Sequence, residues 1–228
     1  IAQLKQEHFG RWEHASRVGS LTFQRKMHDD LPKWQPMLEQ VAEEYQMDWR
    51  LLAAMAYQES HWNPNARSHT GVRGMMMLTR ATASELGVED RTDPLQSLRG
   101  GARFFKTLLR RLPSDIEEPD RTFLALAAYN IGMGYLEDAR IMTQRAGGDP
   151  HLWPDVRAHL PKLQNPNHFP MTKFGFAEGE QAVTYVDNIR HYEGLLSFQN
   201  LPEHRISPPI QVDTLFPAYL RQAPLPVL

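Results

Sequence analysis

The chain has 228 residues, of which 41% are hydrophobic and 23% are charged, and its formal net charge is −2 at pH 7. This is the composition of an ordinary globular protein that is long enough to bury a substantial core. The near-neutral charge argues against nucleic acid as a partner, and the absence of cysteine excludes a disulfide framework and thiolate metal sites.

The start of the chain is polar and of mixed character. Over residues 1–30 we expect a short helix at 3–16 and then a loop, which together form a linker or the end of a preceding domain. The chain begins with Ile1 and contains neither a signal-peptide pattern nor an apolar run near the ~18 residues of a membrane-spanning helix. We therefore interpret it as a processed or truncated piece, and we expect any membrane association to come from parts outside this chain.

Two amphipathic helices follow, the first over 31–46 and the second from Asp48 to about residue 61. Asp48 is a suitable N-cap, and Pro64 disfavours helical backbone at the residue before it. The second helix carries an apolar stripe at helical spacing, which consists of Leu52, Met55 and Ala56 and continues with Glu59. A carboxylate therefore occupies a position where the pattern favours leucine.

Glu59 is our candidate general acid, because it points inward from the last turn of a helix at the edge of a turn-rich loop. Desolvation raises the pKa of such a carboxyl, so that it holds a proton near neutral pH. The alternative is that Glu59 pairs with an arginine or turns toward solvent, since structural ion pairs also draw carboxylates inward. No Asp or Glu occurs from Ser60 to Ser84, whereas most glycosidases use two carboxylates. This pattern favours a reaction that needs no protein nucleophile.

The rest of the chain is dominated by helical periodicity. Residues 62–78 are rich in turn-forming side chains and predict a loop or a small hairpin. Capping residues, apolar spacing and helix-breaking glycine and proline predict further helices over 80–86, 94–112, 120–131, 135–146, 154–160 and 178–198. Residues 201–228 are rich in proline and predict an extended tail. The fold class is therefore all-α, with at most one small β-hairpin.

Several short motifs, taken as a set, resemble a known family. They are Glu59-Ser60, Asn63-Pro64, Ala66, Ser68, Gly71, Gly74 and Ala128-Tyr129-Asn130. Together they resemble the lytic transglycosylases with a goose-type-lysozyme-like fold, over roughly residues 30–200. The run GVRGMMMLT, which contains three consecutive methionines, most resembles the membrane-bound F type of these enzymes.

This resemblance implies a lysozyme-like catalytic domain over 31–200 that cleaves the β-1,4 bond between N-acetylmuramic acid and N-acetylglucosamine in peptidoglycan. Glu59 is then the catalytic residue, first as acid and then as base, and the products end in 1,6-anhydro rings. No cofactor is implied. The expected partners are peptidoglycan glycan strands and muropeptides. The resemblance also implies an amino-terminal regulatory domain of the solute-binding type, and residence in the periplasm at the inner face of the Gram-negative outer membrane.

The same resemblance assigns substrate-binding roles to Ser68, Met77, Tyr129, Asn130 and Tyr185. Each has a simpler alternative when the resemblance is set aside. Ser68 is then a turn residue, Met77 fills the core or lines the cleft where most family members have glutamine, and the remaining three are core or helix-end residues. No metal site is expected, because the ten histidines show no ligand spacing.

Two other functions remain open on the sequence. One is a lysozyme-like muramidase, which is a hydrolase and needs a group that activates water. The other is a glycan-binding module without catalysis, which would keep the tyrosines of the cleft but would need no acid.

Overall fold

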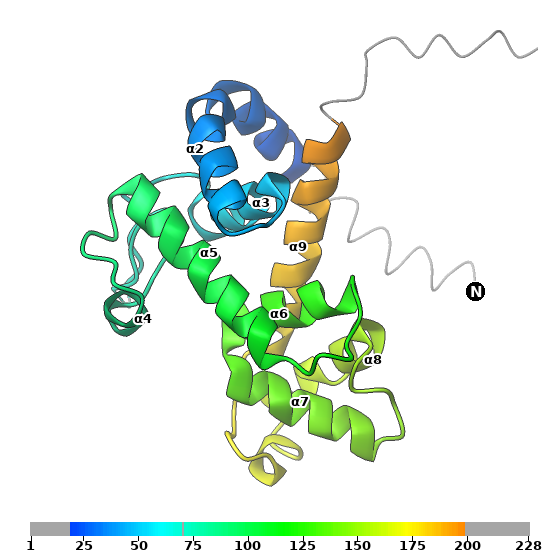
Figure 1. Ribbon diagram of the computed structural model, residues 1–228. Helices are drawn as coiled ribbons and strands as arrows, with labels where there is room; N and C mark the ends of the chain where they lie inside the picture. The colour runs from blue at the N-terminus through cyan, green and yellow to red at the C-terminus, as the bar shows by residue number, and fades with distance from the viewer. Residues whose placement is uncertain (1–18, 70, 199–228) are drawn as a thin grey trace, which may run out of the picture.

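The computed structural model describes residues 19–69 and 71–198, and these residues form an assembly of helices (Figure 1). The helices are α2 (Leu31–Glu44), α3 (Trp49–Ser60), α4 (Arg80–Glu85), α5 (Pro94–Arg111), α6 (Asp120–Ile131), α7 (Met133–Arg145), α8 (Trp153–Arg157), the 3₁₀ helices η1 (Leu160–Gln164) and η2 (Phe169–Met171), and α9 (Gly179–Phe198). In this described part, β-structure is limited to isolated bridges between Arg67 and Arg73 and between Arg73 and Leu78. The predicted all-α class is confirmed.

The first described segment corrects one expectation. A loop was expected between residue 16 and Leu31, but residues 19–29 are helical. The ring of Phe23 is fully buried, and its centroid lies 4.6 Å from those of Tyr57 and Tyr192. The polar sequence gave only a weak helical signal here, because the burial of one aromatic ring against distant helices supplies the stabilisation. The helix expected at 3–16 and the tail at 201–228 lie outside the described residues, so the division of the chain at residues 30 and 200 stays a prediction.

Helix α3 lies at the centre of the fold. Asp48 caps it by accepting a hydrogen bond from the backbone N–H of Arg50 at 2.7 Å. The helix ends where His61 and Trp62 both adopt left-handed backbone conformations, with φ of 54° and 59°, and this agrees with the predicted end. Every residue from Leu51 to Tyr57 is buried, so the core encloses α3 on almost all sides.

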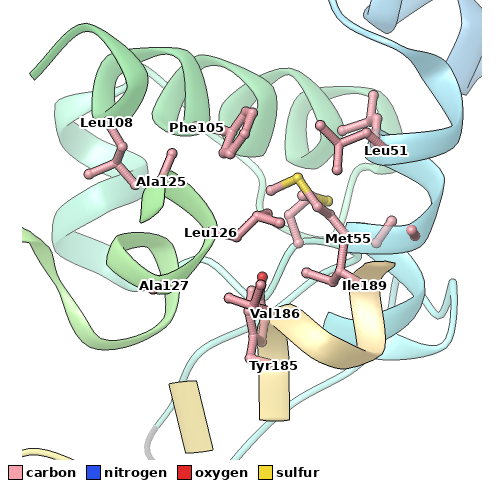
Figure 2. Packing of buried hydrophobic residues seen from close by; sticks show 14 of the residues in the cluster. Leu51, Met55, Phe105, Leu108, Ala125, Leu126, Ala127, Tyr185, Val186 and Ile189 are labelled. Carbon is pink, nitrogen blue, oxygen red and sulfur yellow. The ribbon is translucent and has the colours of Figure 1, made fainter. Parts of the chain in front are cut away.

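The core forms where α3, α5, α6 and α9 meet (Figure 2). Figure 2 shows Met55 of α3 facing Leu126 of α6 and Ile189 of α9, and all three are almost completely buried. Close packing of this kind fixes the relative position of helices that are far apart in the sequence. It therefore sets where the last turn of α3 lies relative to α6 and α9.

The remaining boundaries follow the predicted signals closely. Thr79 and Asp93 cap α4 and α5 through their side-chain oxygens. Helix α7 begins at Met133, two residues earlier than predicted, because Gly132 adopts a φ of +93° and connects α6 directly to α7. The short helix expected over 154–160 is divided into α8 and the 3₁₀ helix η1. Among the described helices, none has the combination of length and apolar character that a membrane span requires.

Candidate active site

Glu59 lies in the last turn of α3 and makes a hydrogen bond with a tyrosine that comes 126 residues later in the chain. The hydroxyl of Tyr185, on α9, donates to Oε1 of Glu59 at 2.7 Å. Tyr185 is only 4% exposed, and Glu59 is partly buried. The partner of the inward carboxylate is thus a neutral hydroxyl, in place of the arginine of the alternative interpretation.

Burial is the main influence on the acidity of Glu59. It raises the pKa of this carboxyl from 4.5 to about 7, while the hydrogen bond from Tyr185 acts in the opposite direction. The charge of a second carboxylate is not among the causes of this pKa shift within the described part of the chain. An isolated carboxyl with a pKa near 7 carries a proton for a large fraction of the time at neutral pH, as a general acid requires.

Tyr129, on α6, lies beside this pair. Its ring is nearly parallel to that of Tyr185, with an interplanar angle of 12° and a centroid separation of 6.4 Å. Its hydroxyl donates to the backbone carbonyl of Met76 at 3.4 Å. Burial, followed by the charge of Glu59, raises the pKa of Tyr129 well above 10, so this hydroxyl stays protonated and available as a donor.

The loop that follows α3 is attached to the end of this helix by the side chain of Ser60. The Ser60 hydroxyl donates to the carbonyl of Met75 at 2.8 Å and accepts from the backbone N–H of Asn63 at 3.1 Å. Because Ser60 is the neighbour of Glu59, these bonds fix the loop relative to the acid. The resemblance included Ser60 in its first motif, but a role for its side chain was not predicted.

The methionine run occupies a tight turn of this loop. Arg73 and Leu78 exchange two backbone hydrogen bonds, at 3.0 and 3.2 Å, so the predicted small hairpin is present as a turn with isolated bridges. Met75 and Met76 are fully buried. Met77 is partly exposed and has a φ of +45°. The first two methionines therefore fill the core, and only Met77 is accessible to a ligand.

The other two predicted site residues, Ser68 and Asn130, both follow Glu59 in the sequence. Ser68 lies in the 62–78 loop, where its Oγ accepts a hydrogen bond from the backbone N–H of Val72 at 3.3 Å. Asn130 follows Tyr129 on α6, and its Oδ1 is buried without a hydrogen-bond partner among the described residues. A buried acceptor of this kind is normally satisfied by water or a ligand.

Two further residues support the site and were missed by the sequence analysis. The Oγ of Ser97 on α5 accepts from the backbone N–H of Met76 at 3.1 Å, and Arg91 donates to the carbonyls of Gly71 and Leu78. Neither residue stands out in the sequence, because a serine in a helix and an arginine in a loop are common. No cluster of three or more potential metal ligands occurs within residues 19–69 and 71–198.

Comparison with known proteins identifies the family of this chain. Residues 36–150 match the family described as the transglycosylase SLT domain. The chain is 50% identical over 199 residues to "Membrane-bound lytic murein transglycosylase F" of Saccharophagus degradans. The aligned residues make up 87% of this chain and 39% of the relative. It is 51% identical over 189 residues to the protein of that name from Alteromonas mediterranea. The aligned residues make up 83% of this chain and 40% of the relative.

A third relative, "Membrane-bound lytic murein transglycosylase F 1" of Alkalilimnicola ehrlichii, is 51% identical over 208 residues, which cover 91% of this chain and 42% of the relative. The chain thus spans about two fifths of the length of these relatives. The match to the family extends over α3 and α6, the helices that carry Glu59, Tyr129 and Asn130. This chain belongs to the transglycosylase SLT domain family, and over most of its length it is similar to the F-type membrane-bound lytic murein transglycosylases.

Proposed function

We propose that this chain is the catalytic part of a peptidoglycan lytic transglycosylase. It cleaves the β-1,4 bond between N-acetylmuramic acid and N-acetylglucosamine without water and leaves 1,6-anhydromuramoyl ends. The observation that carries this proposal is the isolated, partly buried Glu59, whose pKa is raised to about 7 and whose Oε1 accepts a hydrogen bond from Tyr185.

In the first step, the protonated Glu59 donates its proton to the glycosidic oxygen, and the bond between that oxygen and C1 of the muramoyl sugar breaks. Positive charge develops at C1, where the 2-acetamido group of the substrate assists. Glu59 is now a carboxylate, and the Tyr185 hydroxyl stabilises this charge through the bond that it already makes.

In the second step, Glu59 removes the proton from the C6 hydroxyl of the same sugar. The C6 oxygen attacks C1 and closes the anhydro ring, so Glu59 returns to its protonated form. An internal hydroxyl held in position competes well with water, because its effective concentration reaches ~10⁵ M or more in favourable cases. One carboxyl therefore serves both steps, in keeping with the lack of any second carboxylate among the influences on its pKa.

Tyr129, Asn130, Ser68 and Met77 are the proposed substrate-binding residues. Asn130 is supported by its buried Oδ1, which lacks a partner among the described residues and matches a sugar hydroxyl or amide N–H as donor. Met77 is supported by its partial exposure on the turn next to the carbonyl that Tyr129 binds. A thioether offers an apolar surface to a sugar ring, in contrast to the hydrogen bonds of a glutamine.

The whole protein is proposed to be longer than this chain and to act in the periplasm, at the inner face of the outer membrane. The support is the similarity to relatives whose names include "membrane-bound" and of which this chain covers about two fifths. The additional length in those relatives leaves room for the expected regulatory domain of the solute-binding type.

The test is a digestion of purified peptidoglycan sacculi followed by mass spectrometry of the soluble products. We expect muropeptides that end in anhydro sugars and are one water lighter than the products of a hydrolase. Reducing ends would identify a muramidase. Binding of sacculi without soluble products would identify a glycan-binding module.

A variant pair tests the role of the acid. Glu59→Gln is expected to lower turnover by about 10²–10⁴-fold, the usual contribution of general acid–base catalysis. Glu85→Gln, an exposed carboxylate on α4, is the matched control and should keep full activity. Retained activity in a folded Glu59→Gln variant would remove this residue from the mechanism.

A further inference from the structure

A groove with an excess of positive charge runs along α7, beyond the residues that the proposed mechanism uses. Two adjoining hollows, of about 270 and 310 Å³, share the lining residues Met142, Arg145, Met171 and Thr172. We call the combined feature the α7 groove. Figure 1 shows the segment that follows η1 (yellow) lying against α7, and the groove lies between these two parts.

Three cations line the α7 groove without a counter-ion. Arg145 lies in the last turn of α7, Lys162 is in η1, and Lys173 follows η2. None of them makes an ion pair or a side-chain hydrogen bond with another described residue, although Lys173 lies 5.4 Å from the ring centroid of Phe174. This local excess contrasts with the net charge of −2 of the whole chain.

Among the described residues that line the groove, Asp138 is the only carboxylate, and its oxygens already accept hydrogen bonds. Asp138 is 3% exposed, and its two oxygens accept hydrogen bonds from the backbone N–H groups of Lys173 and Phe174 at 3.0 and 2.8 Å. Its negative charge therefore holds the turn in place and is largely unavailable to a ligand. The turn is closed by Thr172, whose Oγ1 accepts from the backbone N–H of Gly175 at 3.1 Å.

This anchored turn connects the groove to the candidate active site. The ring of Phe174 lies against Gly134, so closely that a Cβ there would be 2.8 Å from it, and it makes an edge contact with Tyr135 at 5.9 Å. Gly134 and Tyr135 are in the first turn of α7, four and five residues after Asn130. Phe174, which is 48% exposed, therefore lies against the first turn of α7, directly after the helix that carries Asn130.

We propose that the α7 groove binds the carboxylates of the peptide stems that project from the glycan strand. This inference rests on the proposed function, because it assigns a second part of the same substrate to a second part of the same protein. Stems of peptidoglycan carry several carboxylates, and guanidinium and ammonium groups on an exposed wall attract them. The exposed ring of Phe174 offers an apolar surface between the glycan and the stem.

The experiment compares two substrates, stem-bearing glycan strands and strands from which an amidase has removed the stems. The double variant Arg145→Ala/Lys173→Ala should lower kcat/KM for stem-bearing strands about fivefold to tenfold and leave stem-free strands within about twofold of the unmodified protein. The matched control is Arg111→Ala, an exposed arginine in the last turn of α5 that does not line the groove. It should affect neither substrate.

The possible results are separable. An equal loss on both substrates, or no loss on either, overturns the assignment of the groove. A loss of binding to vesicles of anionic phospholipid, with unchanged turnover of stem-bearing strands, would assign the groove to a membrane surface and likewise overturn the proposal.

Failure of the proposed function would show separately, as reducing ends on the products of both substrates or as a lack of turnover of both substrates by the unmodified protein. Reducing ends would still allow the comparison of the two substrates, whereas a lack of turnover would not. In that case the groove is tested by titrating the protein with a purified disaccharide tetrapeptide and with the same disaccharide without peptide. Preference for the first compound, lost in Arg145→Ala/Lys173→Ala, supports the groove on its own, and equal binding of the two compounds overturns it.

Discussion

The hydroxyl of Tyr185 lies 2.7 Å from Oε1 of Glu59, although 126 residues separate the two in the chain. Both side chains project from helices that are fixed by the core, α9 and α3. The carboxyl therefore has one defined donor in a largely desolvated position. Two influences set the pKa of this carboxyl. Burial raises it, and the hydrogen bond from Tyr185 lowers it.

The raised pKa of Glu59 makes a prediction about stability. Its pKa is about 7 in the folded protein, whereas the ordinary value of 4.5 applies in the unfolded chain, so between these pH values the folded state binds more protons than the unfolded state. The free energy of unfolding therefore decreases as the pH rises from 4.5 to about 7. Glu59→Gln removes this effect and should be more stable than the unmodified protein at pH 8, by roughly 1 to 3 kcal/mol.

Urea unfolding at pH 4 and pH 8 measures this difference. The advantage of Glu59→Gln should be absent at pH 4, where the carboxyl is protonated in both states. Glu85→Gln is again the control, because the exposed Glu85 should give the same small effect at both pH values. An equal change in stability at pH 4 and pH 8 for Glu59→Gln would show that burial does not raise the pKa of this carboxyl.

The pH dependence of turnover tests the tyrosine. The hydrogen bond from Tyr185 lowers the pKa of Glu59, so its removal in Tyr185→Phe should raise this pKa further. The high-pH limb of kcat/KM, which reports the loss of the acid proton, should then move to higher pH. The maximum rate should fall, because the carboxylate formed in the first step loses its donor.

The matched control for this variant is Tyr192→Phe. Tyr192 lies on the same helix, its ring packs against Phe23 and Tyr57, and it is not among the described influences on the pKa of Glu59. This substitution should leave the high-pH limb in place. A limb that moves equally in both variants would mean that it does not report on Glu59.

A pair of glycines tests the turn that supports the methionine run. Gly74 has a φ of +87°, and a Cβ there would lie 1.7 Å from the carbonyl oxygen of Arg91. Gly71 has a similar φ of +85° but nothing within 4 Å of such a Cβ. Gly71→Ala should therefore cost only the backbone strain, about 1 to 2 kcal/mol, whereas Gly74→Ala should cost more than about 3 kcal/mol.

Thermal and urea unfolding of the two variants give these values. Because the turn carries the carbonyl that Tyr129 binds and the exposed Met77, Gly74→Ala should also lower turnover at temperatures where it remains folded. Similar stabilities for the two variants would show that the close approach of Arg91 to Gly74 is not maintained in solution.

Much of the helical framework was predictable because its signals are local. Asp48, Thr79 and Asp93 each cap the helix that the sequence assigned to them. The inward position of Glu59 was predictable, because Leu52, Met55 and Ala56 precede it at helical spacing on the same face of α3. The helix at 19–29 was missed, because its support comes from Phe23 packing against residues of α3 and α9.

Most of the helices, the carboxylate that continues an apolar stripe, and the motifs that resemble the family could be read from the amino-acid sequence. The packing of distant helices was needed to show that Tyr185 is the donor to Glu59 and that Ser60 and Ser97 hold the methionine turn. It was also needed to show that Arg145, Lys162 and Lys173, which form no ion pair with another described residue, line one groove. The physical reason is that caps and periodicity act within a few residues. Desolvation, hydrogen bonding between distant segments and the accumulation of charge depend on which helices the core brings together.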